Sequence, residues 1–205
     1  MEELSSFAIK HNIPVTQTVM GYSTMKRDHS HYAGQIGGLG GKNTNDLAKE
    51  TDLAIAVGTK LADFTTGSWA NFENENFKLL SINVSRFDAN KHLAQAVIGD
   101  AKVSLIELSE ALGDWKVGDE WNEKSQRELK VWNEHIDKES APTNQEVPSY
   151  IQVIGAIYRN SEPTDIAVTA AGGLVGEVVQ VWRPKELNTH ESEWGFSCML
   201  SLIHI

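Results

Sequence analysis

Four short runs of apolar or β-branched residues mark the predicted strands of the chain. The runs cover residues 15–19, 53–57, 79–84 and 166–169. Because they are nearly continuous in such residues, they suit strands that are buried on both faces, as in parallel sheets. Helical stretches lie between them, at 47–51 behind a possible Asn43 or Thr44 cap and at 103–112. Strands that alternate with helices predict an α/β fold in which helices cover both sides of a parallel sheet.

Residues 121–138 have a different pattern, that of one amphipathic helix. Along this stretch apolar or small residues recur at helical spacing: Trp121, Ser125, Leu129, Trp132 and Ile136. Oppositely charged residues four positions apart occupy the rest of the surface: Glu123 and Arg127, Lys124 and Glu128, Glu134 and Lys138. We therefore expect a helix with one face against the core and ion pairs on its solvent face.

A polar, proline-marked stretch after this helix predicts a domain boundary, with a second α/β unit beginning at Ser149. The first helix of that unit would turn four residues toward a core: Ile151, Ile154, Ile157 and Tyr158. One strand at 166–169 and a second helix near 174–182 are too little to close that core, so we expect the unit to be truncated. The predicted division is residues 1–115 for a central domain, 116–148 for a linker with the amphipathic helix, and 149–199 for the beginning of the second domain.

The charge and cysteine content exclude several classes of protein. The formal net charge is -10 at pH 7, which opposes binding to nucleic acid, because that affinity rests on clustered lysines and arginines. A single cysteine, Cys198, rules out an intrachain disulfide and suits the reducing cytoplasm. No apolar run approaches the ~20 residues of a membrane helix, and the N-terminus lacks the order of a signal peptide. We expect a cytoplasmic protein with neither a nucleic-acid nor a membrane partner.

The densest motif is a glycine cluster before a predicted helix, made of Gly34, Gly37, Gly38, Gly40 and Gly41. Bare backbone at such a place can approach a phosphate. Both nucleotide motifs fail, however, because a dinucleotide fingerprint from Gly38 needs glycine where Asn43 stands, and a Walker loop needs one where Ile36 stands. Tight turns explain the cluster better, since glycine readily takes positive φ.

Two further groups of reactive side chains have ordinary structural explanations. His29 and His31 are the right types for a metal site, but two residues apart in a loop they lack a third ligand. Cys198 near His190 is a conceivable nucleophile, although a lone cysteine in an apolar context is more often a core residue. We predict structural roles for both histidines and for the cysteine.

The segment Thr-Ala-Ala-Gly-Gly-Leu at 169–174 is the best placed candidate for ligand binding. Its small residues follow a predicted strand and open a predicted helix. In open α/β sheets ligands bind beyond the carboxyl ends of the strands, often with an anionic group at a helix N-terminus. A plain strand-to-helix turn explains the same residues equally well, so both interpretations stay open.

Taken in order along the chain, these segments resemble thiamine-diphosphate enzymes of the acetohydroxyacid synthase type. The central domain of that family has a similar succession: Asn-Ile-Pro-Val at 12–15, Asp-His at 28–29, the glycine cluster, Thr-Asp-Leu at 51–53, Gly-Thr at 58–59, Ser-Ile-Asn-Val at 81–84 and Val-Ile-Gly-Asp-Ala at 97–101. Each piece is short, but the order is specific. Residues 142–146, 165–173 and 193–199 are most similar to family members that open a ring in inositol catabolism, by hydrolysing a carbon–carbon bond of a trihydroxycyclohexane-1,2-dione.

The resemblance implies a three-domain subunit, of which this chain holds most of the central domain and the start of the diphosphate-binding one. It places four residues against the cofactor diphosphate: Ala171, Gly172, Gly173 and Leu174. It places Met199 where an apolar residue props thiamine diphosphate into its bent form, and the backbone of Ser197 toward the aminopyrimidine. The activating glutamate and the Mg²⁺ motif of the family fall outside this chain. We therefore expect no catalytic or metal-binding residue in it, and no turnover by the fragment.

The resemblance leaves three functions to be separated. The first is a thiamine-diphosphate- and Mg²⁺-dependent hydrolase of the cyclic dione, acting as a homodimer or homotetramer when full length. The second is a related lyase or synthase on the same scaffold, and the third is a non-catalytic nucleotide-binding or interaction module. Residues 200–205, Leu-Ser-Leu-Ile-His-Ile, depart from the family pattern, and we expect them to be a non-native tail.

Overall fold

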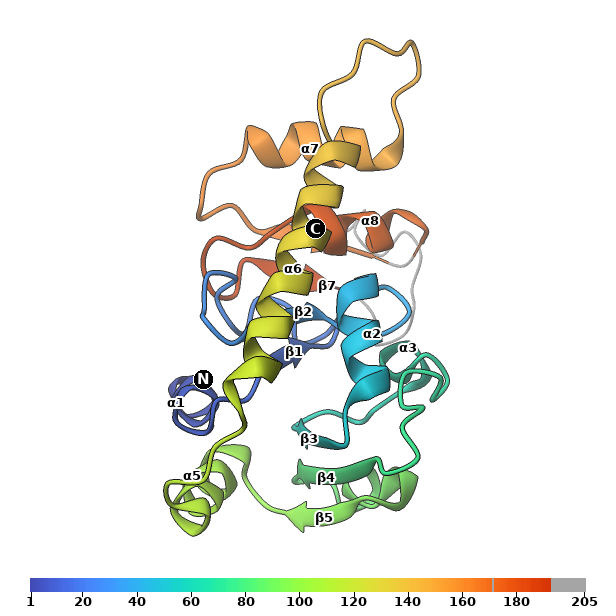
Figure 1. Cartoon of the computed structure of the whole chain (residues 1–205). Coiled ribbons are helices and arrows are strands. Elements are labelled where there is room, and N and C mark those ends of the chain that lie inside the picture. The colour runs from blue at the N-terminus through green and yellow to red at the C-terminus, as the bar shows by residue number, and fades with distance from the viewer. Residues whose placement is uncertain (171, 193–205) are drawn as a thin grey trace.

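The computed structural model describes residues 1–170 and 172–192. In chain order the elements are α1 (Glu2–His11), β1 (Val15–Gln17), β2 (Tyr32–Gln35), α2 (Lys42–Glu50), β3 (Leu53–Val57), α3 (Asp63–Thr66), β4 (Lys78–Asn83), α4 (Arg86–Ala89), a 3₁₀ turn (Lys91–Leu93), β5 (Gln95–Ile98), α5 (Ala101–Leu112), α6 (Asp119–Glu139), α7 (Tyr150–Arg159), β6 (Ala167–Thr169), α8 (Leu174–Val181) and β7 (His190–Ser192) (Figure 1).

All strand pairs of the described chain are parallel. They form a β1–β2 pair, a three-stranded β3–β4–β5 sheet and a β6–β7 pair. Figure 1 shows β2, β1, β3, β4 and β5 one after another, with α1 and α5 on one side and α2 and α3 on the other. The predicted α/β fold with parallel strands is confirmed.

The four predicted strands all form, but β2, β5 and β7 were not predicted. Their sequences are Tyr-Ala-Gly-Gln, Gln-Ala-Val-Ile and His-Glu-Ser, none of which is a continuous apolar run. The expectation of burial on both faces is also wrong for part of the sheet. Leu53 of β3 is 48% exposed and Val168 of β6 is 43% exposed.

Helix α2 begins earlier than predicted, and neither suggested residue caps it. Gly41 occupies the N-cap position. Asn43 and Thr44 lie inside the helix, where both side chains donate hydrogen bonds to the carbonyl oxygen of Ala33, at 3.1 and 3.0 Å. The two polar residues therefore fasten α2 to strand β2 instead of starting the helix.

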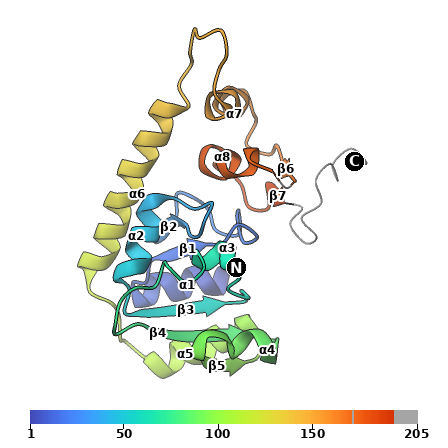
Figure 2. The same ribbon diagram turned by 90° about the vertical axis from the view of Figure 1, so that its right-hand side faces the viewer.

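The long helix α6 is confirmed. It runs along one side of the molecule from the level of the β3–β4–β5 sheet up to that of α7 (Figure 2). Ser125, Leu129 and Ile136 of the predicted stripe are buried. None of the three predicted ion pairs forms in the described chain. Their place is taken by Lys130–Glu134 within the helix and by pairs to other elements, such as Lys124–Glu50. Surface ion pairs of this kind contribute little to stability, so the change of partners matters little for the fold.

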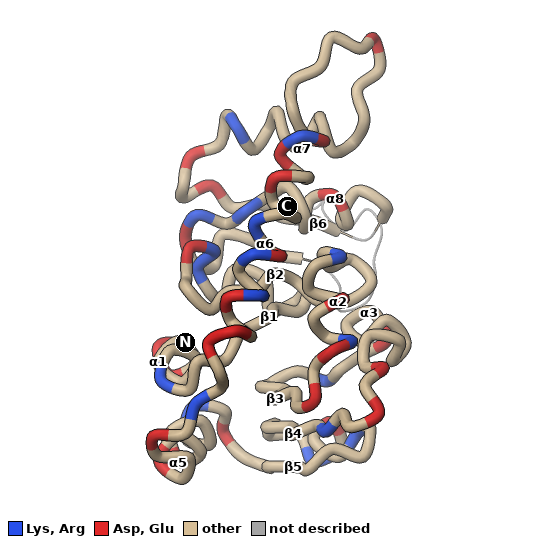
Figure 3. Tube along the Cα trace, viewed as in Figure 1, with Lys and Arg blue, Asp and Glu red and all other residues tan. Residues whose placement is uncertain are grey.

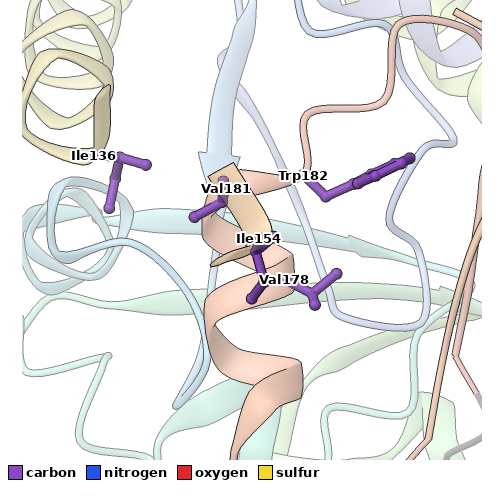
Figure 4. Close-up of a cluster of buried hydrophobic side chains, with 5 residues drawn as sticks. All are labelled: Ile136, Ile154, Val178, Val181 and Trp182. Carbon is purple, nitrogen blue, oxygen red and sulfur yellow. The ribbon is translucent and has the colours of Figure 1, made fainter. Parts of the chain in front are cut away.

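The segment after Ser149 packs onto α6 and not onto a core of its own. Ser149 caps α7 through a reciprocal capping box with Gln152. The core of this segment is a cluster of buried side chains from three helices and the residue after the last: Ile136, Ile154, Val178, Val181 and Trp182 (Figure 4). Ile151 and Tyr158 contact the cluster as expected, whereas Ile157 is 56% exposed and the expectation for it is wrong. The predicted domain boundary stays a prediction.

The described helices include none that is long and apolar enough to cross a membrane. Lysines and arginines are spread along the trace and alternate with aspartates and glutamates (Figure 3).

Candidate functional site

Two described glycines lie between β6 and α8, at the N-terminus of the helix. Gly172 has φ +142, a conformation that L side chains rarely adopt. Gly173 is the N-cap of α8 and provides no side chain to the first amides of the helix. The Gly176 amide donates to the Gly173 carbonyl, at 3.3 Å. The first amides of a helix form the positive end of its dipole. The first N–H groups of α8 therefore lie beside residues without side chains, where a negatively charged group could accept them.

With respect to residues 1–170 and 172–192, the same turn is open at its two glycines. A Cβ atom added at Gly172 or Gly173 meets no heavy atom of the described chain within 4 Å. Leu174, the first residue of α8, is exposed. Among the described residues, the space beside these two glycines and the N-terminus of α8 can take an anionic group such as a diphosphate. Of the residues that the resemblance assigned to the cofactor, Gly172, Gly173 and Leu174 lie together here, while Ala171, Ser197 and Met199 lie outside the described residues.

Two buried hydroxyl groups lie at the carboxyl ends of β6 and β7, next to this turn. Thr169, at the end of β6, and Ser192, at the end of β7, have their oxygens 2.8 Å apart. Because β6 and β7 are parallel, their carboxyl ends share one edge, and the turn leaves from that edge. This is the edge at which the general rule for α/β sheets places a ligand.

His190 of β7 is buried, and its burial was not predicted from the sequence. Its ring lies edge-on to that of Tyr22, with the centroids 4.9 Å apart. Its Nε2 atom is buried and has no hydrogen-bond partner in the described structure. Burial lowers the pKa of His190 to about 4, because the charged imidazolium loses its hydration.

Because the folded chain resists protonation of His190, we expect its free energy of unfolding to fall in mild acid. The unfolded chain takes up a proton below about pH 6.5, but the folded chain resists it until about pH 4. The contribution is therefore fully present above about pH 6.5 and falls as the pH drops toward about 4. Between about pH 7 and pH 4.5 we expect the wild type to lose roughly 2–3 kcal/mol more than His190→Phe, which cannot titrate. Urea denaturation across this range measures the difference, and His135→Asn, at an exposed histidine, should follow the wild-type curve. Parallel curves for wild type and His190→Phe would contradict the prediction.

The glycine cluster proves to be a tightly packed loop, which confirms the interpretation as turns. A Cβ atom at Gly37 would lie 2.1 Å from the carbonyl oxygen of Phe64, and one at Gly40 would lie 2.2 Å from that of Gln35. The side chain of Asn45 both accepts from the Gly37 N–H, at 2.9 Å, and donates to the Gly37 carbonyl, at 3.0 Å. Backbone already fills the space that a phosphate would need.

The two histidines of the loop before β2 also have structural roles. Both ring nitrogens of His31 are engaged, Nε2 with Asn12 Oδ1 at 3.0 Å and Nδ1 with Ser30 Oγ at 2.9 Å. His29 Nδ1 accepts from the backbone N–H of His31. Among the residues placed in the structure no group of three or more potential metal ligands occurs. Cys198 lies outside the described residues.

Two surface hollows lie away from the turn. One, of about 350 Å³, is lined by residues of α1 and α5. The other, of about 300 Å³, lies at the C-terminal end of α6. There Arg159 donates to the carbonyl of Ser140 and Arg183 pairs with Asp137, at 2.7 and 2.8 Å, so both arginines serve the negative end of α6. Neither hollow is lined by Gly172, Gly173 or Leu174.

Comparison with known proteins gives a consistent result. Residues 1–108 match the family model "Thiamine pyrophosphate enzyme, central domain". The chain is 34% identical over 224 residues to a 3D-(3,5/4)-trihydroxycyclohexane-1,2-dione hydrolase of Clostridium tetani, an alignment that covers 97% of this chain and 34% of that protein. Proteins with the same name from Geobacillus thermodenitrificans and Bacillus anthracis are 36% and 32% identical, over 94% and 97% of this chain and 33% and 34% of their own length. The chain thus spans about a third of the length of these relatives.

Proposed function

Because this chain belongs to the thiamine pyrophosphate (thiamine diphosphate) enzyme family, we propose that it is part of a hydrolase that cleaves a carbon–carbon bond of a cyclic 1,2-dione in inositol catabolism. The proposal draws its reaction from the relatives named trihydroxycyclohexane-1,2-dione hydrolase, which are similar to this chain over nearly all of its length. Since the chain covers only about a third of those proteins, activity belongs to the whole protein.

The observation that carries the proposal is the open, uncapped turn before α8. Gly172, Gly173 and Leu174 would hold the diphosphate of the cofactor through backbone N–H groups at the positive end of the helix. Glycine at positions 172 and 173 leaves room for the phosphate oxygens to approach the main chain. On the family resemblance Ala171, Ser197 and Met199 complete this part of the site. When bound, thiamine diphosphate would supply the electron sink that carbon–carbon cleavage requires.

The resemblance further suggests what this third of the protein leaves to the rest. We propose that the activating glutamate and the Mg²⁺ ligands come from parts of the protein beyond this chain, and that a homodimer or homotetramer in the cytoplasm is the working form. The 205-residue chain alone should then have no turnover.

An assay of the complete protein tests the proposal. The complete reading frame should hydrolyse trihydroxycyclohexane-1,2-dione only when thiamine diphosphate and Mg²⁺ are both present. Replacing Gly172 with valine should raise the KM for thiamine diphosphate by about tenfold, equivalent to ~1.4 kcal/mol, because a side chain would then stand where the phosphate approaches. Gly113→Val is the matched control, since Gly113 also has positive φ and open surroundings but lies between α5 and α6.

Two outcomes would contradict the proposed function. Turnover that continues after the cofactor is removed would reject the cofactor assignment. Activity toward 2-oxo acids with none toward the cyclic dione would instead favour a related lyase or synthase.

A further inference from the structure

Helix α8, which begins at the candidate turn, is held both by its own segment and by residues that lie far from it in the sequence. Its own segment contributes α7 and Trp182. On its other side α8 rests on the glycine-rich loop between β2 and α2, here called the bracket loop and defined as residues 36–41. This loop was noticed in the sequence as a possible phosphate site, a role that its packing does not support.

The side chain of Gln180 ties α8 to two other segments at once. Its Oε1 accepts from the indole N–H of Trp132 on α6, at 2.9 Å. Its Nε2 donates to the carbonyl oxygen of Leu39 at the tip of the bracket loop. Making both bonds takes a donor and an acceptor on one side chain, and the amide of Gln180 provides them on one planar group.

The side chain of Leu39 holds the same helix by packing. It contacts a buried cluster formed by Val19, Val175 and Val179. A Cβ atom added at Gly176 would lie 3.4 Å from Leu39 Cδ2, so helix and loop are in close contact at that point. Leu39 therefore supports the first turn of α8, and Gln180 supports the last.

The bracket loop is itself fixed in place. Gly40 and Gly41 donate backbone hydrogen bonds to Gly37 and Gln35, at 2.9 Å each. The Asn45 amide clamps Gly37 from both sides. Because the bracket loop is held by these internal bonds, it provides a fixed surface on which α8 packs.

From these contacts we infer that Leu39 and Gln180 are positioning residues: they set where α8 lies and thereby where Gly172, Gly173 and Leu174 meet the cofactor diphosphate. An eight-residue helix is about 12 Å long. If the end of α8 near Gln180 shifts, the helix tilts and the turn at its other end is displaced. The inference rests on the proposed function of the turn and adds residues that do not touch the cofactor.

The test uses a charge change of minimal size at position 180. Gln180→Glu keeps an acceptor for Trp132 but places a carboxylate against the Leu39 carbonyl. In the complete protein we expect the KM for thiamine diphosphate and its Kd by titration calorimetry both to rise about tenfold, with kcat at saturating cofactor within about twofold of wild type. Gln145→Glu, at an exposed position with the same change of charge, should leave all three values unchanged.

The pH dependence separates positioning from simple loss of stability. A protonated glutamate regains a donor for Leu39, so the excess KM of Gln180→Glu should shrink as the pH falls toward about 5, since burial favours the neutral acid. In the 205-residue chain, amides of residues 175–178 should exchange with solvent faster in Gln180→Glu and in Leu39→Ala, while those of β3 and β4 keep their wild-type protection.

The outcomes distinguish this inference from the proposed function. A wild-type protein that binds thiamine diphosphate, together with a Gln180→Glu variant of equal affinity, would overturn the inference and leave the function standing. A complete wild-type protein with no affinity for thiamine diphosphate would overturn the function, and this inference with it.

Discussion

Replacing Gly37 with alanine should destabilise the chain by roughly 3–5 kcal/mol, as measured by urea denaturation. Two costs add at this position. Gly37 has φ +109, where an L side chain is strained, and its new Cβ would lie 2.1 Å from the Phe64 carbonyl oxygen and 2.9 Å from the Thr65 Cα. Both neighbours are backbone atoms, so neither can rotate away, and either the bracket loop or α3 must shift.

Two neighbouring glycines provide matched controls for this substitution. Gly38→Ala introduces only an ordinary contact, at 3.8 Å, without positive φ, and should cost little. Gly58→Ala places alanine at φ +64 with nothing within 4 Å, and so isolates the strain, on the order of 1 kcal/mol. If Gly37→Ala and Gly38→Ala unfold at the same urea concentration with equal slopes, the clash does not exist in solution.

Replacing Trp182 with alanine should cost a similar amount, roughly 3–5 kcal/mol. Its ring is 8% exposed and belongs to the cluster with Ile136 and Ile154. It also meets the ring of Tyr158 edge-on, with the centroids 5.7 Å apart. Removing the indole leaves a cavity bordered by three helices, which cannot all move inward to fill it.

The control for Trp182 is the same substitution at an exposed tryptophan. Trp115 is 50% exposed, and its role in the fold is a backbone carbonyl that bonds to His11. Trp115→Ala keeps that carbonyl and should change the free energy of unfolding by less than about 1 kcal/mol. Equal losses at the two positions would mean that α7 and α8 do not pack on α6 as described.

The strands that could be predicted from the sequence are those whose signal is local. A continuous run of apolar residues such as 53–57 favours a strand whatever lies around it in the fold. Strand β2 carries no such signal, yet it is buried along its whole length. Its burial comes from residues elsewhere, because Asn43 and Thr44 bind its Ala33 carbonyl and Gln126 binds its Tyr32 carbonyl. No window of a few residues around β2 contains that information.

The candidate site also has one part with a local sequence signal and one part that depends on distant residues. Small residues after a strand and before a helix made a strand-to-helix turn at 169–174 predictable, because that signal lies in adjacent positions. Its role in holding a diphosphate stays a proposal. The contacts that place α8 were not predictable. Gln180 meets Trp132 across 48 residues and Leu39 across 141, and neither partner has a residue type that would single it out. The same holds for His190, whose burial depends on Tyr22.

The shared core of α6, α7 and α8 also constrains how this protein can evolve. Ile136 lies before the proline-marked stretch and Trp182 after it, yet they belong to one cluster. A gene rearrangement that joined a foreign domain at residues 141–148 would separate these partners and leave an apolar surface on each piece. We therefore expect the segments before and after residues 141–148 to be inherited together, with substitutions in one part of this cluster matched by compensating substitutions in the other.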